Sequence, residues 1–177
     1  IEQPPRAMTA NLAADIVNGA YWLREPGPNA SVVIAYQGAV APEAIAATGL
    51  AAEDLRDVGL LAITSADRLN AGHQAAERAR QRGNAEARSH IERLLGPLAR
   101  DCGLVTVIDG HPATLAWIGG VHGHKVKALG VEHFGQTGAI SDLYRHHGVD
   151  ANAIVHAAQA VSAGRHVRHA RALPPER

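Results

Sequence analysis

The sequence predicts an α/β fold in which helices cover both faces of a mostly parallel β-sheet. Three runs of strand length, at residues 31–36, 59–64 and 104–108, are almost continuously apolar. This pattern is typical of central strands that are covered on both faces. Apolar residues at helical spacing follow each run. The alternation of strand and helix indicates a parallel sheet with right-handed crossover connections.

Composition limits the class of protein. The 177 residues suit one domain, and the hydrophobic fraction of 46% with 19% charged residues is ordinary globular usage. Because the formal net charge is zero, nothing in the overall charge favours nucleic acid. The single cysteine, Cys102, forms no intramolecular disulfide and suits a reducing compartment, and we interpret it as a buried, inert thiol.

No apolar run reaches membrane-spanning length, and the first residues lack the basic and apolar regions of a signal peptide. We therefore expect no membrane partner and a cytoplasmic location. The chain begins with Ile rather than Met, and we expect it to be a piece of a longer protein.

The first part of the chain predicts a linker, a helix, an edge strand and a central strand. Residues 1–11 hold two prolines and little periodicity, so we expect a linker from an upstream domain. Residues 11–18 predict a short helix that Gly19 ends. Residues 20–24 are β-prone and a short turn joins them to the central strand at 31–36, so we expect them to form an antiparallel edge strand.

Two further strand and helix units follow. Pro42 and Glu43 mark a helix start after the loop that holds Gly38. The strand at 59–64 leads into a helix that starts at Ser65. That helix ends in a basic run, Arg78, Arg80 and Arg82, which we interpret as a solvated helix end that complements the helix dipole.

The last third predicts a helical stripe at residues 91–98, the buried strand at 104–108 and a short helix that bears Leu115, Trp117 and Ile118. A strand from 126, a glycine-rich loop and two helices follow. Ile140, Leu143, Tyr144 and His147 share the spacing of one apolar helix face. Gly148 stops that helix, and Asp150 is a candidate cap for the next. We expect one domain over residues 12–164 and a basic, frayed tail at 165–177.

This last stretch resembles the end of the C-terminal domain of the transketolase family, which has a Phe-Gly loop, a helix, a Gly-Val-Asp turn and a final apolar helix. The matching residues are Phe134, Gly135, Thr137, Leu143, Tyr144, Gly148, Val149, Asp150, Ile154 and Val155. Residues 19–25 and 31–47 are similar to the family's edge strand, central strand, loop and first helix. Residues 60–69 resemble the pyruvate dehydrogenase branch more than transketolase proper, whereas residues 109–126 depart from both.

The resemblance implies a three-layer α/β/α fold with a five-stranded mixed sheet and one antiparallel edge strand. It implies the C-terminal domain of a thiamine-diphosphate-dependent enzyme, either a transketolase or the homodimeric first component of pyruvate dehydrogenase. In that family two preceding domains hold thiamine diphosphate, its magnesium ion and the catalytic glutamate. We therefore expect no catalytic, cofactor or metal residue here, and an inactive isolated chain.

The same resemblance implies a structural, dimer-interface and regulatory role in a parent that transfers a two-carbon unit or decarboxylates a 2-oxo acid. The expected partners are the upstream domains of the same chain and a second copy in a homodimer. In the dehydrogenase branch the acyltransferase of the complex is a further expected partner.

Several residues are candidates for an interface or a ligand loop, because loops at the carboxyl ends of the strands form the ligand crevice of such sheets. Asp109 and His111 are the best-placed acid/base pair. The alternative is that Asp109 caps the helix that Pro112 starts. The candidates are Gly38, Asp109, His111, His133 and Phe134.

Two other hypotheses stay open. The chain could be a free-standing module that binds a small ligand or an anion through the loops after Tyr36, Thr64 and Ile108. It could also be a histidine-rich protein that binds zinc or nickel, since it holds 11 histidines. Their spacings match no standard metal pattern, which favours surface, capping and interface roles.

Overall fold

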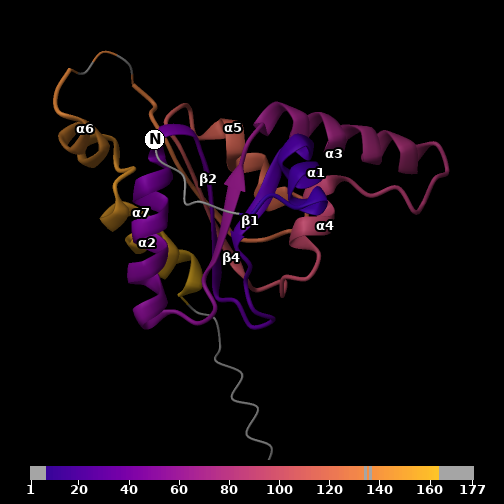
Figure 1. The fold of residues 1–177 in the computed structure, drawn as a ribbon, viewed down its shortest axis with the longest axis horizontal. Helices are drawn as coiled ribbons and strands as arrows, with labels where there is room; N and C mark the ends of the chain where they lie inside the picture. Colours follow the sequence, from indigo (N-terminus) through magenta and orange to yellow (C-terminus); the bar gives the residue numbers. More distant parts are fainter. Residues whose placement is uncertain (1–6, 134, 136, 164–177) are drawn as a thin grey trace, which may run out of the picture.

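The structure, a computed structural model, describes residues 7–133, 135 and 137–163. A five-stranded sheet lies between two layers of helices (Figure 1). The strands run in the order β1-β3-β2-β4-β5, and all neighbours are parallel except β1 and β3, which are antiparallel. Their bounds are β1 Ala20–Arg24, β2 Val32–Gln37, β3 Gly59–Ile63, β4 Gly103–Ile108 and β5 Val126–Leu129. The predicted fold, including the antiparallel edge strand, is confirmed.

Each face of the sheet has its own set of helices. One face carries α2 (Ala41–Asp54) and α7 (Ala151–Ser162), and the other carries α3, α4, α5 and the 3-10 helix η2. These bounds are α3 Ala66–Gln81, α4 His90–Leu95, α5 Ala113–Ala116 and η2 Trp117–Gly120. The remaining elements are α1 Ala10–Asn18, the 3-10 helix η1 Gly38–Val40 and α6 Ile140–His147.

Strand β2 explains why the central runs are continuously apolar. Its side chains alternate between the two hydrophobic clusters: Val32, Ile34 and Tyr36 lie on the side of α2 and α7, and Val33 and Ala35 lie on the other. Both clusters exclude water, so apolar residues are favoured on both sides of the strand. A strand sequence in which apolar and polar residues do not alternate therefore indicates a strand in the central layer, covered by helices on both faces.

Helix α7 begins beside α2 without help from its own cap residue. Asp150 occupies the N-cap position but makes no side-chain capping bond, contrary to the prediction. Instead, Glu43 Oε2 accepts a hydrogen bond of 2.8 Å from the backbone N–H of Ala151. The carboxylate of α2 thus satisfies one exposed donor at the start of α7 and fixes the two helices to each other.

The predicted apolar face of α6 is only partly used. Ile140 is 69% exposed, and no side chain of α6 is fully buried. Tyr144 is half-buried against the cluster on the α2 and α7 side, and Val149, beyond the helix, is fully buried. Because α6 lies at the periphery of the molecule (Figure 1), its first turn has no sheet to pack on.

Acid is expected to weaken the packing of the loop that enters β5. His124 is buried there, and its Nδ1 bonds the carbonyl oxygen of Cys102 at 3.0 Å, while Nε2 has no partner among the described residues. Burial lowers the pKa of His124 below 6.5, the bond to Cys102 opposes this shift, and the charges of His122 and Arg100 add to it. The folded chain therefore takes up this proton less readily than the unfolded chain.

His124 consequently contributes stability that is fully present above pH 6.5 and is lost as the pH falls below that value. We expect the urea midpoint of the chain to fall more between about pH 7.5 and about pH 5 than that of His124→Gln. His156→Gln, at an exposed position, is the matched control and should keep the full dependence. Equal pH dependence of the chain and His124→Gln would contradict this assignment.

Candidate functional site

The topology places a switch point between β2 and β4. The chain leaves β2 through α2 on one face to reach β3, then crosses through α3 and α4 on the other face to reach β4. The loops after β2 and β4 therefore diverge, and the carboxyl ends of these two strands are the usual ligand crevice of an open α/β sheet. Gly38 and Asp109, two of the candidate residues, follow these strands directly.

The structure brings Gly38 and Asp109 together. Asp109 Oδ2 accepts a hydrogen bond of 3.1 Å from the backbone N–H of Ala39. Gly38 has a φ of 84°, and a Cβ atom added there would overlap the Asp109 carboxylate. Glycine is thus required twice, for its left-handed backbone and for the space beside the carboxylate. The carboxylate of Asp109 therefore already uses the backbone N–H of Ala39, which is the donor that an anion would need at this place.

His111 does not complete an acid/base pair with Asp109 in this structure. Its Nδ1 accepts a hydrogen bond of 3.2 Å from the backbone N–H of Ala113 at the start of α5. The alternative prediction, that Asp109 caps this helix, is wrong. The side chain that bonds a backbone N–H at the start of α5 is His111, whereas Asp109 accepts from Ala39. The two side chains are neighbours in sequence that serve different loops.

The other two candidates lie on the segment after β5. Gly130 packs against the backbone of the loop that carries Asp109, and the N–H of Val131 donates a bond of 2.8 Å to the carbonyl of Gly110. His133 is exposed beyond this contact. Phe134 falls outside the described residues.

Sequence reasoning missed Glu43 as a member of this edge. Burial raises the pKa of Tyr144, and the negative charges of Asp109 and Glu43 raise it further. Two carboxylates therefore lie near the phenol: Asp109 from the loop after β4 and Glu43 from the first turn of α2. Glu43 was interpreted only as the acidic first turn of a helix, because no local signal connects it to residues about a hundred positions away.

The carboxyl end of the sheet around β2 and β4 carries two negative charges, and both carboxylates are hydrogen-bonded to backbone N–H groups of this chain. Asp109 and Glu43 both accept backbone N–H donors, so their first bonds are already made within the chain. Among residues 7–133, 135 and 137–163, no three His, Cys, Asp or Glu side chains lie close enough to hold a metal ion. Within that same part of the chain, no helix combines the length and apolar character needed to cross a membrane.

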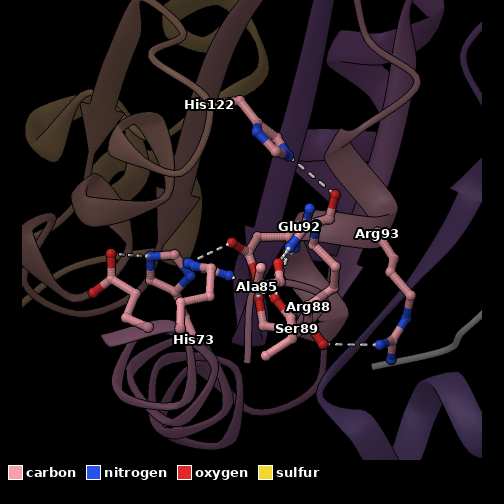
Figure 2. Close-up of polar contacts among 10 residues, drawn as sticks. His73, Ala85, Arg88, Ser89, Glu92, Arg93 and His122 are labelled. Atoms are coloured by element: carbon pink, nitrogen blue, oxygen red, sulfur yellow. Dashed lines mark hydrogen bonds and ion pairs between the residues drawn. The ribbon is translucent and has the colours of Figure 1, made fainter. Parts of the chain in front are cut away.

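A second polar cluster lies on the opposite face of the sheet, around Glu92 of α4 (Figure 2). Glu92 Oε2 accepts from the backbone N–H and the hydroxyl of Ser89 at 2.6 and 2.7 Å, and Glu92 Oε1 pairs with Arg80 at 2.9 Å. Burial alone would raise the pKa of Glu92, but the bonds from Ser89 and the charge and bond of Arg80 outweigh it and lower the pKa to about 2. The cluster ties α3 to α4 and is structural.

The fold of this chain is similar to part of several solved structures, although its sequence matches no known family. No protein-family model matches the sequence, and no curated protein matches it. Among solved structures, transketolase from Leishmania mexicana aligns over 84% of this chain with a TM-score of 0.60 and 16% identity. Transketolase from Campylobacter jejuni aligns over 80% with a TM-score of 0.56 and 20% identity. In both cases this chain covers 18% of the transketolase.

A third structure, described as a split gene transketolase forming an inactive beta4 tetramer, aligns over 82% of this chain and 42% of its own, with a TM-score of 0.52 and 19% identity. All three matches span most of this chain and a minor part of the other protein. The chain therefore has the α/β fold found in transketolases, which confirms the resemblance at the level of the fold.

Proposed function

We propose that the chain is the C-terminal domain of a thiamine-diphosphate-dependent enzyme of the transketolase type. The observation that carries the proposal is the coverage: most of this chain aligns with only 18% of two transketolases. The sequence resemblance in the loop and helices at residues 133–155 supports the C-terminal position. The role that follows is to stabilise the parent enzyme and its dimer, with the chemistry carried by other domains.

The residues of the candidate edge do not fit the cofactor. The diphosphate of thiamine diphosphate would have to approach the amide of Ala39, where Asp109 already binds and would repel it. Glu43 adds a second negative charge near Tyr144. This supports a parent in which other domains hold the cofactor and magnesium. It also weighs against a free-standing anion-binding module.

Gly38, Asp109, His111, His133 and Phe134 remain our candidates for contact with the rest of the parent or with a regulator. They follow the strand ends of the sheet, where open α/β folds present their loops to other groups. The homodimer and the cytoplasmic location belong to the same proposal.

The first component of a pyruvate dehydrogenase complex is the second candidate. It is favoured by residues 60–69, where β3 leads into Thr64 and Ser65. Thr64 Oγ1 donates to the carbonyl of Ile16 at 2.7 Å and joins the end of β3 to α1, whereas Ser65 Oγ accepts from the N–H of Arg68 at 3.2 Å and caps α3. For this candidate an acyltransferase of the complex is the proposed partner.

The proposal predicts the state of the native protein. An antibody against this chain should recover, from the source cell, a polypeptide or complex several times larger that carries thiamine diphosphate. Mass spectrometry would measure the size, and acid extraction with a thiochrome assay would measure the cofactor. Recovery of the 177-residue chain alone, free of thiamine diphosphate, would contradict the proposal.

A further inference from the structure

Positive charge is concentrated at the carboxyl end of α3 and in the loop after it. Residues 78–93 contain five arginines and two glutamates, although the formal net charge of the whole chain is zero. Figure 1 shows this end of α3 and the following loop extending beyond the other elements. Four of the arginines are exposed: Arg78, Arg82, Arg88 and Arg93. Arg88 and Arg93 lie beside α4, and we name these two the arginine surface.

The glutamates of this segment leave the arginine surface uncompensated. Glu92 uses one carboxylate oxygen for Arg80 and the other for Ser89. Arg80 is thus the one arginine of the segment that the described residues neutralise. Glu86 is exposed and forms no ion pair within the part of the chain that the structure describes.

Backbone carbonyls hold two of the exposed guanidinium groups in place. Arg88 Nη1 donates to the carbonyl oxygens of Ala85 and Ala87 at 2.8 and 2.9 Å, and Arg93 Nη1 donates to the carbonyl oxygen of Arg88 at 3.1 Å. Figure 2 shows both side chains beside α4. A carbonyl oxygen orients a guanidinium without cancelling its charge, and several N–H donors remain for another partner. The surface therefore presents oriented cations.

We propose that the arginine surface binds an acidic segment of a partner polypeptide. Guanidinium groups in fixed positions match the two oxygens of a carboxylate. Single-stranded nucleic acid is disfavoured because residues 78–93 include no Phe, Tyr or Trp on which bases could stack. The one aromatic ring system of the segment, the imidazole of His90, is engaged with the carbonyl oxygen of Ala20 at 2.8 Å. The proposal is independent of the proposed function.

Titration of fluorescent poly-L-glutamate into the full chain tests this site by anisotropy. We expect binding that weakens with salt, and about tenfold weaker binding by Arg88→Gln/Arg93→Gln. Arg78→Gln/Arg82→Gln removes the same charge from this segment but leaves the arginine surface intact, so it should weaken binding less than about twofold. The matched control is Arg56→Gln/Arg145→Gln, at exposed positions elsewhere, which should bind as the parent chain does.

Three outcomes would overturn the proposal. The first is no binding of poly-L-glutamate at low salt. The second is equal loss of affinity in the control, in Arg78→Gln/Arg82→Gln and in Arg88→Gln/Arg93→Gln, which would indicate a response to total charge. The third is tighter binding of a single-stranded oligonucleotide than of poly-L-glutamate of the same number of charges, which would assign the surface to nucleic acid.

Discussion

Gly38→Ala is expected to lower the free energy of unfolding by about 3 kcal/mol, because it combines a strained backbone with a collision. The φ of 84° at this position costs an alanine about 1–2 kcal/mol. The new methyl group would also overlap the carboxylate of Asp109 and break its bond to Ala39. Urea denaturation monitored by circular dichroism would measure the change.

A matched glycine separates the two causes. Gly83 has a φ of 96°, and nothing lies within 4 Å of a Cβ added there, so Gly83→Ala should cost only the backbone strain, about 1 kcal/mol. Removing the carboxylate with Asp109→Ala should reduce the cost of Gly38→Ala to a similar value. If Gly38→Ala costs no more than Gly83→Ala, the close contact between the two loops is not what the structure indicates.

The second large effect is expected at Glu92. Its pKa falls from 4.5 to about 2, which corresponds to about 3 kcal/mol of stability carried by the ionised carboxylate. Because the folded-state pKa is lower than that of the unfolded chain, this stability is present above pH 4.5 and is lost as the pH falls toward about 2. Glu92→Gln should be less stable by about 3 kcal/mol at neutral pH and should lack this part of the acid dependence.

Glu86→Gln is the control for Glu92→Gln, since Glu86 is exposed in the same segment. It should change stability by less than about 0.5 kcal/mol. Urea midpoints measured across the acid range would compare the three chains. Equal stability of the two variants would show that the bonds among Arg80, Ser89 and Glu92 do not hold α3 to α4.

The parts of the fold that depend on local pattern were predictable. The run of β2 predicts a central strand because every residue from Val32 to Tyr36 is buried, which favours apolar side chains at each position. Gly38 and Asp109 were each predicted as candidate residues because each directly follows a strand. The bond between Asp109 and Ala39 spans 70 residues, and no periodicity or spacing encodes it.

Other parts depended on tertiary partners that sequence patterns do not identify. The spacing of Ile140 indicates an inward face, but the helix lies where no apolar surface meets its first turn, and Ile140 stays exposed. The basic run of α3 was interpreted as solvated. That is correct for Arg78 and Arg82 and wrong for Arg80, whose partner Glu92 is on another helix.

The most direct test of the central claim is calorimetric titration of thiamine diphosphate with magnesium into the 177-residue chain, beside the native protein that contains it. The account predicts no saturable heat for the chain, because Asp109 occupies the amide at the switch point and no metal group is found among the described residues. It predicts stoichiometric binding to the native protein. Tight, stoichiometric binding to the chain alone would contradict the account and would place the cofactor at the loops after β2 and β4.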